Sequence, residues 1–214
     1  PRSTLFPYTT LFRSPLANPV LIAILIIGAV LIATKTPHAR YFEGARFVHV
    51  LLGPATVALA LPIIRHRALI RRQWRAILGA IVIGAGVGIA TASGLAILTG
   101  LSPETIASLA PKSVTAAIAM GISEQVGGTP PLTAVLVIST GILGAVLITP
   151  LMNLIGVTDY AARGFAAGLA AHGIGTARAL QVNEKAGAHA ALAMGLNGLV
   201  TALMAPLLLA LLLR

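Results

Sequence analysis

Two short segments combine cationic and hydroxyl side chains with helix-breaking residues, and both are candidates for binding a small anion. In residues 110–115, Pro111 precedes Lys112, Ser113 and Thr115. Proline favours the first turn of a helix, where free N–H groups and the helix dipole attract anions. Lys112 adds a full positive charge, so the segment predicts a carboxylate site. The alternative is that the lysine snorkels to a membrane surface and the hydroxyls bond their own helix.

The second segment, residues 172–178, reads HGIGTAR and predicts a substrate site of similar chemistry. Its two glycines permit an unwound backbone and close approach to a ligand. Arg178 offers a planar fork that suits a carboxylate, and Thr176 adds a hydroxyl. His172 could carry a coupled proton near neutral pH. The alternative is a packed, hydrogen-bonded histidine and an arginine at the membrane edge.

Three further polar residues are candidates for ion coupling or charge pairing. Glu124 precedes a double glycine and could pair with Lys112 or Arg178, or could instead cap the next segment in solvent. Thr56 lies in residues 52–60, LGPATVALA, which align weakly with residues 109–117, LAPKSVTAA. Chance similarity within an Ala/Val/Leu-rich composition explains that repeat equally well. The third candidate is Asn197, inside the last apolar stretch.

The sequence offers little support for an enzyme, a resident cofactor or a metal site. It has no paired-carboxylate motif, no His-rich ligand spacing and no phosphate-binding glycine loop with lysine. The Gly-Ile-Gly at residues 173–175 follows no strand, so it is not a dinucleotide fingerprint. With no cysteine, disulfides and thiolate metal sites are excluded.

The composition predicts that these segments are held inside a membrane. Hydrophobic residues make up 57% of the 214 positions, charged residues only 9%, and the mean hydropathy is +0.94. A soluble domain carries about 25% charged residues, so the solvent of this chain must be largely lipid. The net charge of +10 lies in short connectors and forms no stripe for nucleic acid. Residues 65–75 hold five arginines, which is typical of a cytoplasmic loop.

Hydropathy predicts an all-α, polytopic transmembrane bundle. Two polar, interrupted segments, residues 110–128 and 163–180, alternate with apolar runs long enough to span a bilayer. Ser102-Pro103-Glu104 predicts a helix start. Because irregular backbone survives at membrane depth only inside protein or around a wet cavity, we expect the two broken segments to meet and form a positive pocket. The apolar spans are residues 16–34, 47–64, 76–101, 132–155 and 186–213.

Residues 1–14 are interpreted separately. Residues 4–14, TLFPYTTLFRS, match the codon-by-codon translation of a short-read sequencing adapter. We therefore expect residues 1–14 to be an assembly artefact, and residues 15–214 to be one transmembrane domain truncated at its N-terminus.

Three stretches resemble the LrgB/CidB family in order and spacing. They are residues 110–128, APKSVTAAIAMGISEQVGG, residues 162–208, beginning ARGFAAGLAAHGIGTARAL, and residues 43–63, EGARFVHVLLGPATVALALPI. Members usually have another hydrophobic segment upstream, where this chain carries the adapter-like string.

The resemblance implies two activities. Bacterial members are regulators of murein hydrolase activity and autolysis that act with a holin-like LrgA/CidA-type partner, whereas plastid members resemble glycolate/glycerate translocators and some bacterial pairs are linked to pyruvate uptake. We therefore expect a multi-pass protein of the bacterial inner membrane that moves small monocarboxylates, with a homo-oligomer as one possible assembly. The alternative is a regulator that acts through partner contacts without transport.

Overall fold

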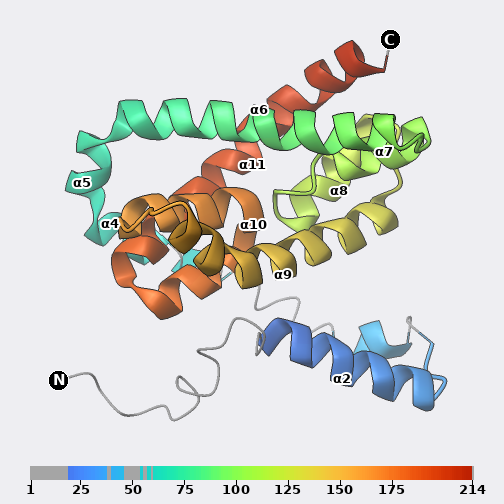
Figure 1. Ribbon diagram of the computed structural model, residues 1–214. Helices are drawn as coiled ribbons and strands as arrows, with labels where there is room; N and C mark the ends of the chain where they lie inside the picture. Colours follow the sequence, from blue (N-terminus) through green and yellow to red (C-terminus); the bar gives the residue numbers. More distant parts are fainter. Residues whose placement is uncertain (1–18, 38–39, 46–53, 55–56, 59, 214) are drawn as a thin grey trace.

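The computed structural model describes residues 19–37, 40–45, 54, 57–58 and 60–213, and these residues form helices and connectors without a strand (Figure 1). The predicted all-α class is therefore confirmed. The helices are α2 (Pro19–Ala33), α4 (Ala60–Arg65), α5 (Arg67–Arg72), α6 (Trp74–Leu98), α7 (Pro103–Leu109), α8 (Ala116–Gln125), α9 (Pro130–Leu154), α10 (Tyr160–Val182) and α11 (Glu184–Leu212).

Within the described residues, three helices are long and apolar enough to cross a membrane: α6, α9 and α11. They contain 25, 25 and 29 residues, against the roughly 20 that a bilayer requires. The prediction is confirmed for these three spans. The first predicted span is the shorter apolar helix α2, and most of the second, residues 47–64, lies outside the described residues together with residues 1–14.

Side-chain size is distributed as expected for a protein dissolved in lipid. Large apolar side chains face outward, with Leu98 exposed by 86% and Leu211 by 69%. The buried positions are dominated by alanine, glycine, serine and threonine. Lipid is as apolar as leucine, so helices in a membrane associate through small residues that let backbones approach closely.

Helices α7 and α8 form a hairpin whose two ends lie together. Ser102 caps the N-terminus of α7 by accepting a hydrogen bond from the Thr105 N–H, with Pro103 in the first turn, so the predicted helix start is confirmed. After α8, the Thr129 N–H donates to the Ser108 hydroxyl at 2.7 Å. The Thr129 hydroxyl also bonds Glu104. The chain therefore enters and leaves this hairpin at the end of the bundle where α6 stops.

Helix α10 is a second hairpin, broken in its middle. Ala171 and His172 have non-helical dihedral angles, and His172 has a φ of +40°. A Cβ atom placed on Gly175 would lie 2.3 Å from the carbonyl oxygen of Ala167, so the second arm folds back onto the first. Asp159, which precedes α10, and Lys185, in the first turn of α11, form an ion pair of 2.8 Å. The first arm of α10, residues 160–170, therefore starts at the end of the bundle opposite to the α7–α8 hairpin. The second arm, residues 173–182, returns to that same end.

Close packing of α10 on α11 depends on glycine. Gly164 and Gly168 lie on one face of the first arm, and a Cβ atom on either would sit 2.0 Å from a backbone oxygen of α11, that of Ala186 or Ala190. This arrangement of small residues four positions apart is a common means of helix contact in membranes. It brings the first arm of α10 and the start of α11 side by side and parallel.

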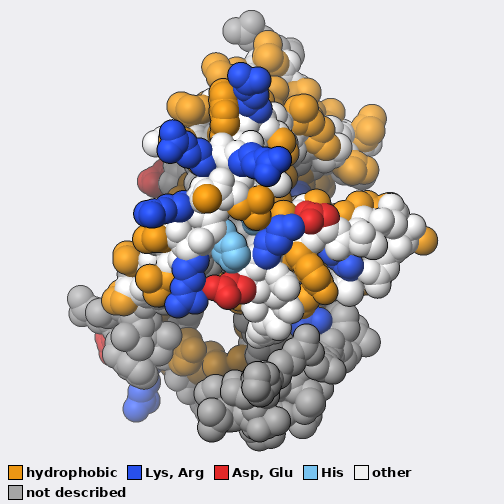
Figure 2. Space-filling model, turned by 90° about the vertical axis from the view of Figure 1, so that its left-hand side faces the viewer, with side chains coloured by type: hydrophobic (Ala, Val, Ile, Leu, Met, Phe, Trp, Pro, Cys, Tyr) orange, Lys and Arg blue, Asp and Glu red, His pale blue; other side chains and the backbone are white. Residues whose placement is uncertain are grey.

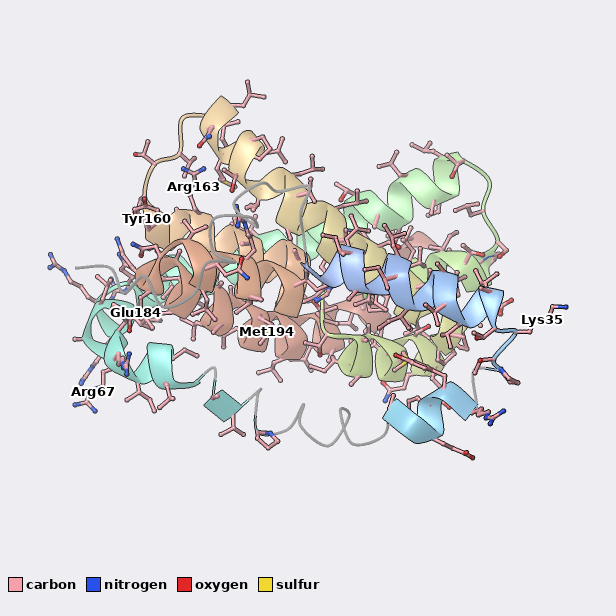
Figure 3. The ribbon with its side chains drawn as sticks, turned by 90° about the horizontal axis from the view of Figure 1, so that it is seen from below. Lys35, Arg67, Tyr160, Arg163, Glu184 and Met194 are labelled. Atoms are coloured by element: carbon pink, nitrogen blue, oxygen red, sulfur yellow. The ribbon has the colours of Figure 1, made fainter. Side chains whose placement is uncertain are left out.

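One end of the bundle carries most of the positive charge, and we call it the arginine-rich end. It contains the five arginines of residues 65–75, which the structure places mainly on α5 and the helix ends beside it. Figure 2 views this end and shows Lys and Arg side chains spread across it. In Figure 3, Arg67, Arg163 and Glu184 lie at this end, and Met194 lies near the middle of the bundle.

Ion pairs and capping hold the arginine-rich end together. Arg65 pairs with Glu184 at 3.0 Å, and Asp159 caps α10 by accepting from the Ala162 N–H. The hydrogen bond from Lys185 lowers the pKa of Asp159 below its ordinary value. The stabilisation from this contact is therefore present at neutral pH and is lost as the pH falls through the lowered pKa.

Candidate functional site

The tips of the two hairpins line one cavity of about 490 Å³, which we call the tip cavity. Lys112 and Ser113 contribute from the loop between α7 and α8, and Ala170 and Ala171 from the break in α10. Helices α6 and α9 form its sides, and Asn197 of α11 also lines it. Because the hairpins enter from opposite ends, the tip cavity lies between those ends.

Lys112 is half-buried in this cavity and its Nζ atom is 3.5 Å from the Ser113 hydroxyl. The ion pairs among the described residues join Arg65 to Glu184 and Lys185 to Asp159, so neither includes Lys112. A lysine away from bulk water needs an anionic or hydrogen-bonding partner to offset its desolvation. A carboxylate ligand in the cavity would supply that partner.

Asn197 joins both hairpin tips to α11. Its Nδ2 atom donates to the carbonyl oxygens of Ser113, at 3.2 Å, and of Leu169, at 2.9 Å. Ser113 lies in a loop, and the break in α10 interrupts the helical ladder that would bring the Gly173 N–H to Leu169. The buried Asn197 amide thus donates to one carbonyl oxygen from each interrupted segment. Its Oδ1 atom accepts a hydrogen bond from the Thr201 hydroxyl at 3.1 Å.

His172 forms the bend of α10 and points into the protein against α9. Its side chain is buried, and Nε2 lies 2.9 Å from the carbonyl oxygen of Val137. The contact needs a glycine on α9, since a Cβ atom at Gly141 would lie 2.6 Å from the imidazole. A positive φ in a residue other than glycine is uncommon and such residues concentrate at functional sites. His172 therefore holds the tip of the α10 hairpin against α9, next to the tip cavity.

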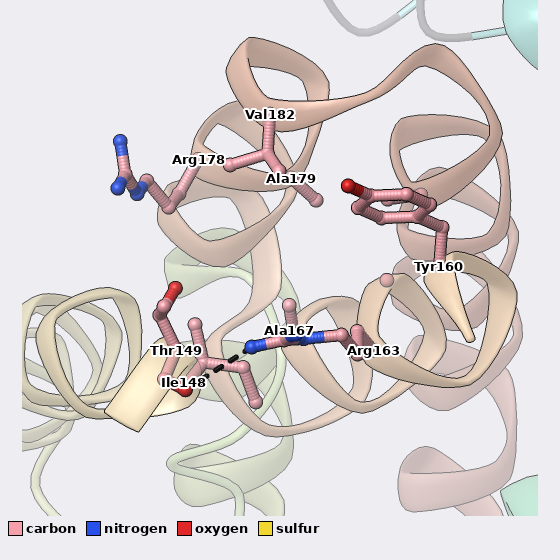
Figure 4. A pocket seen from close by; sticks show the side chains of 10 residues that line it. Ile148, Thr149, Tyr160, Arg163, Ala167, Arg178, Ala179 and Val182 are labelled. Carbon is pink, nitrogen blue, oxygen red and sulfur yellow. Dashed lines mark hydrogen bonds between the residues drawn. The ribbon is translucent and has the colours of Figure 1, made fainter. Parts of the chain in front are cut away.

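Arg178 does not share the tip cavity with Lys112. It lines a separate pocket of about 30 Å³, which we call the arginine pocket, together with Tyr160 and Arg163 (Figure 4). The second arm of α10 is helical after its break, so six residues beyond His172 carry Arg178 about 9 Å along the arm toward the arginine-rich end. We expected a single pocket containing both Lys112 and Arg178. The structure instead places these two residues in separate cavities.

The remaining candidates are dispersed. Thr176 is buried and donates to the carbonyl oxygen of His172 at 2.7 Å, which steadies the break. Thr115 is the N-cap residue of α8 and does not line the tip cavity. Glu124 is exposed in the last turn of α8 and takes part in neither ion pair of the described residues. Thr56 lies outside those residues.

Sequence reasoning did not identify the glycine that lets one hairpin tip approach α9. A Cβ atom on Gly144 of α9 would lie 2.5 Å from the Cβ of Ala171, whereas one on Gly88 of α6 would make only an ordinary contact, 3.8 Å from the Ser113 hydroxyl. Both glycines line the tip cavity. Glycine spacing within the apolar spans was the available signal, but it indicates close packing without naming the partner.

The polar groups of the tip cavity suit the binding of a small anion. Within the described part of the chain, no group of three or more His, Asp or Glu side chains is gathered as a metal site requires. The tip cavity combines the amine of Lys112 with the hydroxyl of Ser113, while the Asn197 amide in its lining already bonds the two hairpin carbonyls and Thr201. Such a set can hold and orient a small carboxylate.

Comparison with known proteins identifies the family. The sequence model of the LrgB-like family matches residues 5–211. The chain belongs to the LrgB-like family. It is 34% identical to a protein of Haemophilus influenzae over 91% of this chain and 84% of that one. It is 30% identical to the holin-like protein CidB of Staphylococcus epidermidis, covering 92% and 86% of the two chains, and 32% identical to YwbG of Bacillus subtilis, covering 90% and 85%.

The LrgB-like match covers every residue that lines the tip cavity. The family resemblance seen in the polar motifs is thereby confirmed. No solved structure matches the chain. The family assignment and the apolar helices together make this a membrane protein.

Proposed function

We propose that this LrgB-like protein transports small monocarboxylates of the glycolate, glycerate or pyruvate type across the bacterial inner membrane. The observation that carries the proposal is Lys112 in the tip cavity, between two interrupted hairpins that enter from opposite ends. Transporters commonly bind substrate where discontinuous helices meet near the bilayer midplane. Because the two hairpins enter from opposite ends, one site between their tips can be reached by two routes, one from each end. Alternating access requires two such routes.

Lys112 supplies the charge that selects an anion. Replacing it with glutamine keeps a polar side chain of similar reach and removes the charge. A hydrogen bond to a charged group contributes about 1.5–3 kcal/mol, and each 1.4 kcal/mol is tenfold in affinity. In proteoliposomes, we expect Lys112→Gln to reduce uptake of radiolabelled glycolate, glycerate and pyruvate by about 10–100-fold.

The matched control is Lys35→Gln, since Lys35 is an exposed lysine at the end of α2, far from the cavity in sequence and outside its lining. Its uptake should equal that of the unmodified protein. Equal uptake by Lys112→Gln would contradict the assignment of Lys112.

The second candidate is a regulator of murein hydrolase activity that works with an LrgA-type partner and transports nothing. The name holin-like, carried by the Staphylococcus epidermidis relative, favours it. If the purified protein moves none of the three acids while Lys112→Gln still alters autolysis in cells, the regulatory function is the better description.

The proposed orientation places the arginine-rich end in the cytoplasm, because arginine and lysine are retained on that side of a membrane. The cysteine-free chain allows single labels, and Ala68 and Leu101 are exposed at the two ends. We expect an impermeant maleimide to label Leu101→Cys in intact cells, but to label Ala68→Cys only after permeabilisation. The reverse pattern would invert the orientation.

A further inference from the structure

The tip cavity and the arginine pocket share a wall. Ile148 of α9 and Ala167 of α10 line both cavities. Lys112 lies on one side of this wall and Arg163 and Arg178 on the other. Two cationic cavities in contact through one pair of apolar side chains resemble successive positions on one path for an anion.

We propose that the arginine pocket is an outer binding station for the carboxylate group of the substrate, and that the Ile148 side chain is the gate between this station and the tip cavity. The inference rests on the proposed transport function and specifies its path toward the arginine-rich end.

The arginine pocket is built to receive a small anionic group. Arg163 uses its Nη2 atom to donate to the Thr149 carbonyl at 3.1 Å and to Asn153 Oδ1 at 2.6 Å. These bonds fix the guanidinium beside α9, and a guanidinium has five N–H donors, so others remain for a ligand. Figure 4 shows the Arg163 side chain running toward Thr149 and Ile148, with Arg178 on the facing arm and projecting away from Tyr160. A volume of about 30 Å³ suits a single carboxylate group.

Ile148 is the movable half of the wall. Ala167 is 3% exposed, and its carbonyl is so close to Gly175 that a Cβ atom there would lie at 2.3 Å. Ile148 is only half-buried. It lies two residues before Pro150, which has no N–H to donate to the Val146 carbonyl, so α9 is weakened at this turn. A rotamer change of Ile148 or a small bend of α9 would therefore open the path.

The test uses an Ile148→Cys variant, because the chain has no other cysteine and the block can be added after folding. Reaction with benzyl methanethiosulfonate places a bulky ring in the wall. We expect glycolate flux in proteoliposomes to fall at least tenfold and to recover with dithiothreitol. Val135→Cys, exposed on the same helix and lining neither cavity, is the matched control and should keep its flux after the same treatment.

Arg178→Gln tests the outer station by comparing flux that starts from the two sides of the membrane. We expect the KM for glycolate to rise about tenfold for flux starting at the arginine-rich end, measured in inverted vesicles, and to rise less for uptake into cells. An equal rise in both directions would overturn the outer station. Undiminished flux through the modified Ile148→Cys protein would overturn the gate and leave the proposed function standing. If the unmodified protein neither binds nor moves the acids, the proposed function fails and this inference fails with it.

Discussion

Gly168→Ala should destabilise the protein, whereas Gly195→Ala should leave it as stable or more so. A Cβ atom at position 168 would lie 2.0 Å from the Ala190 carbonyl oxygen, which belongs to a helix backbone and cannot rotate away. The first arm of α10 would have to separate from α11, and such overpacking typically costs about 1–3 kcal/mol. In contrast, nothing lies within 4 Å of a Cβ at the exposed Gly195, and removing a mid-helix glycine gains about 0.5–1 kcal/mol.

The melting temperature of each variant is measured in detergent by monitoring the circular dichroism signal of its helices. For a chain of this length, each kcal/mol corresponds to about 2–4 °C. The two variants should therefore move in opposite directions, although both add a single methyl group. A Gly168→Ala protein that melts at or above the Gly195→Ala temperature would contradict the packing described for α10 and α11.

Asn197→Leu should uncouple the two hairpin tips while leaving a folded protein. The substitution removes the donors that serve the Ser113 and Leu169 carbonyls. Hydrogen bonds between membrane helices contribute about 0.6 kcal/mol on average and at most about 1.7 kcal/mol, so losing two costs about 1–3 kcal/mol. The larger effect is on geometry, because no other side chain of the described residues is seen to bond both tips. We expect transport to fall by more than tenfold.

The control for this variant is Thr201→Val, which preserves shape and removes only the hydroxyl that donates to Asn197. It should keep most of the activity. Nitroxide labels at the exposed residues Gln125 and Val182, at the bases of the two hairpins, report the coupling by pulsed electron resonance. The distance distribution should broaden in Asn197→Leu and remain narrow in Thr201→Val. An unchanged distribution in Asn197→Leu would show that the tips are held by other contacts.

Several properties of this protein are determined by the sequence alone. A chain with 9% charged residues cannot cover itself with solvated groups, so membrane residence follows from composition. Long apolar runs then predict α6, α9 and α11 because the bilayer thickness sets the length of a helix. Residues 110–128 and 163–180 are identified as interrupted segments because Pro111 and the glycines after His172 disfavour a continuous apolar helix. Polar motifs in the right order also predicted the family.

The tertiary structure decided which residues share a cavity. Local sequence cannot say whether a broken segment crosses the membrane or returns, and here both return, since Thr129 bonds Ser108 and Asp159 pairs with Lys185 across long stretches of chain. The separation of Arg178 from Lys112 follows from the helical arm that resumes after the break. The double role of Asn197 depends on two carbonyls brought together from residues 84 and 28 positions away. Such contacts arise from the packing of distant segments, and hydropathy measured along the chain contains no information about them.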